Sequence, residues 1–163
     1  MCGVTGVVLF DPAAVVDRDL LIRMRDTLCH RGPDESGLWV DGPVGLAHRR
    51  LRVIDLEGSR QPMGNPTAGI WLSYNGEVYN FRELRRELEG KGYRFTSTGD
   101  TEVVLRAYEA YGIEVASHLE GMFALAIWDA RHQRLVLCRD RFGIKPLYYS
   151  LRPWGIAFAS ELR

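Results

Sequence analysis

The chain has 163 residues, 46% of them hydrophobic, and its 21 Lys and Arg balance its 21 Asp and Glu, so its formal net charge is zero. This length fits one compact domain with its own core. The balanced charge argues against a nucleic-acid or membrane-surface partner, and no apolar run approaches the roughly 20 residues that span a bilayer.

The first ten residues, MCGVTGVVLF, predict a buried strand, and the stretch lacks the basic start of a signal peptide. Asp17 is a predicted N-cap for a helix that runs to Leu28, because apolar residues recur at helical spacing. HRGPDESG is a predicted loop. LWVDGPVGLAH predicts a hairpin that turns at Asp41-Gly42.

GIWLSYN predicts a further strand that ends at Asn75-Gly76. Asn80 is a predicted cap for a helix over 81–90, and a second helix is predicted over 100–112. An antiparallel meander of short strands follows, over 121–129, 134–140, 146–151 and 155–160. Helices segregated from antiparallel strands favour an α+β layered sandwich over a βαβ fold.

The three cysteines, Cys2, Cys29 and Cys138, are an odd set with wide spacing. This spacing argues against a disulfide framework and fits a reducing cytosol. There is no C-x-x-C pair, and the four histidines lack the spacing of metal ligands, so we predict no metal site.

Cys2 follows the initiator methionine directly, and Met1 is expected to be removed because the side chain of Cys2 is small. A terminal α-amine has a pKa of about 7.7–8.0, so it can act as the base for its own thiol. Core filling is the alternative, and position alone favours it. The two readings differ in that only a nucleophile requires the loss of Met1.

Three further features bear on this choice. Asn75-Gly76 is typical of a turn, but an amide side chain next to a glycine N–H can also stabilise an oxyanion. Arg49-Arg50 at a strand end is ordinarily solvated, but a guanidinium also grips a carboxylate through paired hydrogen bonds. Asp100 before a helix is either an N-cap or a carboxylate that holds a substrate ammonium. Together these groups describe a site for a free α-amino acid with a reactive side-chain carbonyl, and glutamine fits it.

The blocks MCGVTGV, HRGPDESG, AHRRLRVIDL, NGEVYN, STGDTE, LEGMFALAIWD, RDRFGIKPLYY and FASEL resemble, in order, the glutamine amidotransferase domain of glutamine-hydrolysing asparagine synthetases. These are class II, or N-terminal-nucleophile, amidotransferases, and the resemblance covers essentially the whole chain. It implies a four-layer α/β/β/α sandwich of two antiparallel sheets. It also implies that residues 1–163 are a glutaminase domain, with no cofactor of its own, in the cytoplasm.

The resemblance implies that Cys2 attacks the glutamine amide, that Asn75 and Gly76 form the oxyanion hole, and that the product is glutamate plus ammonia. It places Arg50 on the α-carboxylate and Glu77 and Asp100 at the α-amino group. Backbone groups of Leu51 and Val53 line the same pocket.

Many relatives carry another residue before the key arginine. We choose Arg50 because the Leu51 and VID that follow it fix the register, and Arg49 is the alternative. His30, Arg31 and Asp34 are expected to order a loop near the site. Phe123, Leu125 and Ile127 are predicted core. RDRFGIKPLYY is predicted to be a structural loop that supports the site or faces a neighbouring domain.

In the family, ammonia passes to a C-terminal synthetase domain that uses ATP and Mg²⁺, and that domain is absent from this sequence. The oligomeric state is left open, so an oligomer is possible. Two other readings remain: a non-catalytic docking domain of the same fold, and an N-terminal-nucleophile hydrolase that acts on another amide.

Overall fold

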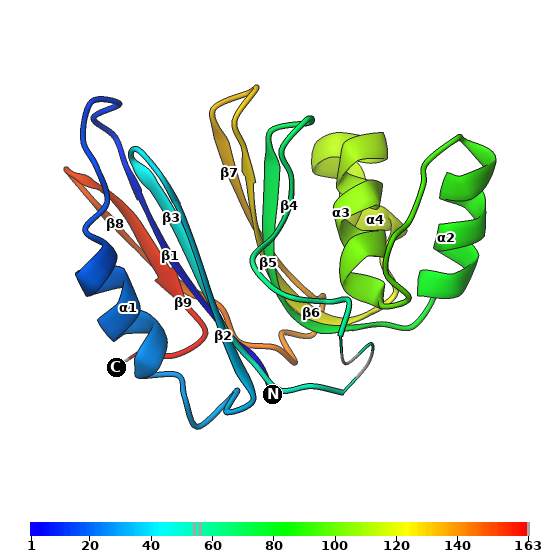
Figure 1. Cartoon of the computed structure of the whole chain (residues 1–163), viewed down its shortest axis with the longest axis horizontal. Coiled ribbons are helices and arrows are strands. Elements are labelled where there is room, and N and C mark those ends of the chain that lie inside the picture. The colour runs from blue at the N-terminus through cyan, green and yellow to red at the C-terminus, as the bar shows by residue number, and fades with distance from the viewer. Residues whose placement is uncertain (54, 56, 163) are drawn as a thin grey trace.

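The computed structural model describes residues 1–53, 55 and 57–162, which form two antiparallel sheets packed face to face (Figure 1). The first sheet has the strand order β2-β3-β1-β9-β8, and the second has the order β4-β5-β6-β7. Helices lie on the outer face of each sheet. The elements in chain order are β1 (Gly3–Leu9), α1 (Arg18–Asp26), β2 (Glu35–Asp41), β3 (Val44–Arg50), β4 (Met63–Asn65), β5 (Ile70–Val78), α2 (Phe81–Gly90), α3 (Asp100–Tyr111), η1 (Gly112–Glu114), α4 (Val115–His118), β6 (Gly121–Asp129), β7 (Arg134–Arg139), β8 (Tyr148–Arg152) and β9 (Gly155–Ala159).

An apolar core joins the two sheets. Val4 and Leu46 of the first sheet belong to one buried cluster with Ala126 and Trp128 of the second. At the edge of this core Trp39 stacks on Trp71, with ring centroids 4.6 Å apart. Face-to-face packing of this kind buries the inward side chains of both sheets and fixes their relative position.

Helix α1 lies on the outer face of the first sheet and helices α2 and α3 lie on that of the second, which confirms the predicted four layers. Leu21 of α1 is buried against Val7 and Ala47 of the first sheet. On the other side, α3 buries Val103 and Val104 in the largest core cluster, and α2 packs beyond α3 (Figure 1). Among the described residues no helix is long and apolar enough to cross a membrane.

Strand β6 is buried on both faces, and its residues Phe123, Leu125 and Ile127 are core, as predicted. Phe123, Leu125 and Ile127 lie in the core beneath α2 and α3. The alternate residues Ala126 and Trp128 lie in the core between the sheets. Successive strand side chains point to opposite faces, so one strand supplies both cores.

The predicted end of a strand at Asn75-Gly76 is wrong. Strand β5 continues to Val78, and Asn75 and Gly76 pair with Ala124 and Phe123 of β6. The non-local pairing with β6 overrides the local turn preference of Asn-Gly.

The predicted meander is also wrong in one respect, because its four strands are divided between the two sheets. β6 pairs with β7 in the second sheet, whereas β8 pairs with β9, and β9 pairs with β1 in the first. The connection between β7 and β8 is held by Asp140, whose carboxylate accepts hydrogen bonds from the N–H groups of Phe142, Ile144 and Lys145.

Two further differences concern the helices. Asp17 caps α1 as predicted, through hydrogen bonds from the N–H groups of Asp19 and Leu20, but α1 ends at Asp26. Asn80 stands at the N-cap position of α2, yet its side chain makes no capping bond to that helix. Its amide bonds the 118–120 segment instead, donating to His118 O at 2.9 Å and accepting from Glu120 N at 3.0 Å.

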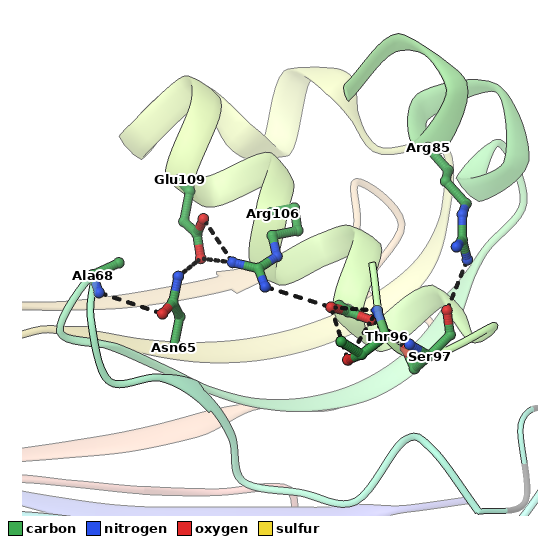
Figure 2. A network of polar contacts seen from close by, with 8 residues as sticks. Asn65, Ala68, Arg85, Thr96, Ser97, Arg106 and Glu109 are labelled. Atoms are coloured by element: carbon green, nitrogen blue, oxygen red, sulfur yellow. Dashed lines mark hydrogen bonds and ion pairs between the residues drawn. The ribbon is translucent and has the colours of Figure 1, made fainter. Parts of the chain in front are cut away.

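A polar network holds α3 in place on the second sheet (Figure 2). Arg106 pairs with Glu109 at 3.0 Å, and Glu109 accepts a hydrogen bond from Asn65 at 2.9 Å. At the other end Glu102 accepts the N–H groups of Thr96 and Ser97. These bonds fix the chain that leads into the first turn of α3, where Asp100 lies.

Candidate active site

A cavity of about 230 Å³ opens beside the start of β1. This volume is below the roughly 300–1,000 Å³ of pockets for drug-sized ligands, so the cavity suits a small metabolite. The structure brings all the residues predicted for the site to its lining: Cys2, Arg50, Leu51, Val53, Asn75, Gly76, Glu77 and Asp100.

Cys2 lies just before β1 and is partly buried. Its Sγ atom is 3.4 Å from the N–H of Leu51, which donates to it. The carbonyl of Cys2 accepts a hydrogen bond from Arg31 Nε at 2.9 Å. Burial raises the pKa of the Cys2 thiol, although the Leu51 N–H and the nearby positive charges act to lower it.

Met1 is part of the cavity wall, and its Sδ atom lies 3.5 Å from Lys145 Nζ. While Met1 is attached, the nitrogen of Cys2 is an amide and has no basicity. Loss of Met1 would create an α-amine beside the thiol and would remove one side chain from the cavity.

Arg49 and Arg50 point in opposite directions, as neighbours on a strand do. Arg50 is buried in the cavity wall, where Nη1 is 3.0 Å from Glu35 Oε2 and Nη2 donates to the carbonyl of Asp55 at 2.6 Å. Arg49 instead donates to Gly32 O at 3.0 Å and pairs with Asp26 at 3.7 Å. The arginine that lines the cavity is therefore Arg50.

Asn75 is 2% exposed, and its Nδ2 atom has no hydrogen-bond partner among the described residues. Buried amide donors are nearly always satisfied, and an orphan costs roughly 1–3 kcal/mol. Because Asn75 also lines the cavity, this unsatisfied donor is available to a ligand there.

The backbone edge of β5 beside Asn75 also carries donors. Strand β4 begins at Met63, which pairs with Leu72, so the later residues of β5 have no strand on that side. The N–H of Tyr74 finds Gln61 Oε1 at 2.6 Å, and the N–H of Val78 finds Asp100 Oδ2 at 3.1 Å. The alternation of strand N–H groups places that of Gly76 on the same edge, between them.

No other residue fits at Gly76. A Cβ there would lie 2.3 Å from the carbonyl oxygen of Met122 and 2.7 Å from the Cα of Phe123. These are backbone atoms of the paired strand, so they cannot move aside without disturbing the sheet.

Asp100 is the first residue of α3, and Gly99 occupies the N-cap position, so the capping alternative for Asp100 is wrong. Its Oδ2 atom accepts hydrogen bonds from the Tyr74 hydroxyl at 2.7 Å and from Val78 N. Burial raises the pKa of Asp100, while these two bonds act to lower it. Burial and the Asp100 charge raise the pKa of Tyr74 well above its usual value, which keeps the phenol protonated as the donor.

Residues of the HRGPDESG block make hydrogen bonds that hold the chain at Cys2 and at Arg52. Arg31 pairs with Glu161 at 2.9 Å as well as holding Cys2, and His30 Nε2 lies 3.0 Å from the same carboxylate. Asp34 accepts the N–H of Arg52 at 2.8 Å. Their contacts agree with the predicted loop-ordering role.

Several residues of the lining were not predicted from the sequence: Ser59, Gln61, Tyr74, Thr101 and Lys145. Gln61 precedes a three-residue strand, and no periodic pattern marks it. Lys145 lies in the block predicted to be a structural loop. No cluster of three or more His, Cys, Asp or Glu residues suited to a metal ion occurs in the described part of the chain.

A model of the glutamine amidotransferase domain family matches residues 1–163. The chain is 42% identical over 165 residues to glutamine-hydrolysing asparagine synthetase 3 of Bacillus subtilis, covering 100% of this chain and 27% of that protein. It is 47% identical over 163 residues to asparagine synthetase 1 of the same organism, covering 99% and 26%. The chain thus spans about a quarter of the length of these relatives.

The fold is similar to that of a solved structure, the glutamine phosphoribosylpyrophosphate amidotransferase of B. subtilis complexed with ADP and GMP. The TM-score is 0.77 at 20% identity, over 98% of this chain and 42% of that one. This likeness supports the α+β sandwich. The higher identity to the synthetases agrees with the resemblance drawn from the sequence blocks.

Proposed function

We propose, on the premise that the chain belongs to the glutamine amidotransferase domain family, that it hydrolyses the side-chain amide of L-glutamine to L-glutamate and ammonia. Cys2 is the nucleophile, and its α-amine, freed when Met1 leaves, is the general base.

The observation that carries the proposal is the orphaned amide of Asn75. A buried donor with no protein partner, in the wall that also holds Cys2, is what an acyl-transfer site requires. The Asn75 amide and the Gly76 N–H form the oxyanion hole. Neither donor has to be pulled away from another described side chain when the oxyanion develops, so the hole is preorganised.

The remaining lining residues hold the amino-acid end of glutamine. Arg50 binds the α-carboxylate, and Asp100 and Glu77 hold the α-ammonium group. Backbone groups of Leu51 and Val53 line the same end. Opposite charges at one end of the cavity orient the substrate so that its amide reaches Cys2.

The reaction needs no cofactor. The terminal amine takes the thiol proton as sulfur attacks the amide carbon, and the resulting oxyanion is held by Asn75 and Gly76. Collapse breaks the C–N bond, and the terminal ammonium protonates the leaving nitrogen, so ammonia departs and a thioester remains. Water then attacks the thioester with the amine again as base, which releases glutamate and restores the thiol.

In the longer protein that the relatives suggest, residues 1–163 are the glutaminase domain and a C-terminal synthetase domain receives the ammonia in the cytoplasm. ATP and Mg²⁺ serve that second domain, which activates an acceptor carboxylate; aspartate is the acceptor in an asparagine synthetase. An oligomeric assembly is compatible with this arrangement.

The test is glutamate release from glutamine by the chain and by its Cys2→Ala variant, after mass spectrometry has verified that Met1 is gone from both. We expect glutamate and ammonia in equal amounts from the parent and background release from the variant. Equal release by both would overturn the assignment of Cys2. Cleavage of other amides in preference to glutamine would overturn the assignment of glutamine as the substrate.

A further inference from the structure

Asp55 makes an unusual set of contacts between two walls of the cavity. Its backbone has a φ of 49°, in the left-handed region that Asp tolerates better than most residues. Leu51, Val53 and Gln61 belong to the cavity wall. Asp55 lies between Val53 and Gln61 in the chain, and its side chain contacts Thr98 and Gly99, which lead into α3.

The carboxylate of Asp55 accepts hydrogen bonds from Gly58 and Ser59 and from the two residues that lead into α3. Oδ1 accepts the N–H of Gly58 at 2.9 Å. Oδ2 accepts the N–H groups of Thr98 and Gly99 at 3.0 Å each, and the hydroxyl of Ser59 at 3.2 Å. Thr98 and Gly99 lead directly into Asp100 at the start of α3.

The backbone carbonyl of Asp55 also binds Arg50, on the other wall of the cavity. The carbonyl of Asp55 accepts from Arg50 Nη2 at 2.6 Å. Asp55 therefore joins Arg50 to the residues that precede Asp100. Arg50 and Asp100 are the groups proposed to hold the α-carboxylate and the α-ammonium of the substrate.

The packing around the carboxylate leaves no room for larger neighbours. A Cβ on Gly58 would lie 2.5 Å from Asp55 Oδ2, and a Cβ on Gly99 would lie 2.3 Å from Ser59 Oγ and 3.0 Å from Asp55 Cβ. Burial acts to raise the pKa of Asp55, but the hydrogen bonds from Gly58, Thr98 and Gly99 outweigh it and hold the pKa below its usual value. The group is thus an acceptor-only carboxylate at neutral pH.

We propose that Asp55 is a positioning residue that sets the distance between Arg50 and Asp100 and thereby determines the affinity of the site for free α-amino acids. This inference rests on the proposed function, because the two clamped groups are the substrate's carboxylate and ammonium. Asp55 does not touch the amide, so its loss acts on KM for glutamine far more than on kcat.

The test uses Asp55→Gly, which keeps the freedom for a positive φ but removes the carboxylate, and Asp55→Asn, which keeps the shape and one acceptor oxygen. The matched control is Asp129→Gly. Asp129 also binds two backbone N–H groups of a turn, those of Arg131 and His132, together with the Tyr108 hydroxyl, and it does not line the cavity.

We expect Asp55→Gly to raise the KM for glutamine at least about tenfold, from the loss of hydrogen bonds to a charged group, with kcat within about threefold of the parent. The KM of Asp55→Asn should lie between those of the parent and Asp55→Gly. Asp129→Gly should lower the melting temperature without changing KM.

An unchanged KM in a folded Asp55→Gly variant would overturn the inference and leave the proposed function intact. An equal rise in KM for Asp129→Gly would also overturn it, because the effect would then be a general loosening of the fold. If the parent released no glutamate, the proposed function would fail first and the inference with it.

Discussion

Arg49 and Arg50 are adjacent in the chain, yet their guanidinium groups lie on opposite sides of the first sheet. Arg50 faces the cavity and bonds Glu35 and the carbonyl of Asp55, whereas Arg49 bonds Gly32 and Asp26. His48, two residues before Arg50 and on the same side of β3, reaches across to Ser73 of the second sheet at 3.0 Å. The alternation of the strand thus separates two arginines that local sequence alone leaves equivalent.

Replacing Arg50 with Ala should raise the KM for glutamine by about 10- to 100-fold, because charge-assisted hydrogen bonds to the α-carboxylate are lost. Arg49→Ala should leave KM within about threefold of the parent. Steady-state kinetics of glutamate release measures both. A loss of affinity in Arg49→Ala alone would contradict the placement of the clamp.

Replacing Asn75 with Ala should lower kcat by about 10²- to 10³-fold with little change in KM, because the amide acts on the oxyanion rather than on bound glutamine. Ser73→Ala is the matched control, since Ser73 is buried on the same strand and bonds His48. It should lose stability and keep kcat. Equal kcat values for Asn75→Ala and the parent would exclude Asn75 from the oxyanion hole.

Retention of Met1 should lower kcat by about 10²- to 10⁴-fold, the usual contribution of a general base. The comparison needs one preparation, assayed before and after treatment with a methionine aminopeptidase. Intact mass gives the fraction processed, and activity should rise in proportion to it. Full activity in a sample that retains Met1 would rule out the terminal amine as the base.

The stability of the fold should depend on pH through His48. Burial, and then the nearby charge of Arg50, lower the pKa of His48 to about 3. The unfolded chain has a histidine pKa of about 6.5, so below that pH the unfolded state binds a proton that the folded state does not. The free energy of unfolding therefore falls as pH decreases from 6.5 toward 3, by up to about 1.4 kcal/mol per pH unit.

Urea unfolding at pH 7, 6 and 5 measures this slope, and His48→Gln should reduce it whatever its effect on stability at pH 7. The carboxylates whose pKa values are lowered lose their stabilisation only at more acidic pH, so they add little in this window. An identical slope in His48→Gln and the parent would show that His48 is not the group involved.

Much of the fold could be predicted because its elements carry strong local signals. Asp17 and the spacing of Leu84 and Leu88 marked helices that the structure contains. The division of β6–β9 between two sheets could not be predicted, because it depends on β9 pairing with β1, more than 140 residues away. Local patterns contain no information about such partners.

The site was predicted residue by residue from the resemblance, and the structure brings those residues to one cavity, although their roles stay predictions. The residues that were missed, such as Gln61 and Asp55, have side chains that accept hydrogen bonds from backbone N–H groups of segments distant in the sequence. Neither periodicity nor motif spacing marks such a contact. The N-cap alternative for Asp100 failed because the helix begins one residue earlier than a cap at Asp100 requires, with Gly99 at the N-cap position.

The central claim is that Cys2 is the nucleophile of a glutamine site. A glutamine analogue that carries a diazoketone in place of the side-chain amide tests it most directly on the Met1-free chain. Peptide mapping should find one label, on the peptide that begins at Cys2, and an excess of glutamine should prevent it. Labelling of Cys29 or Cys138 instead, or labelling of Cys2 that glutamine does not slow, would contradict the account.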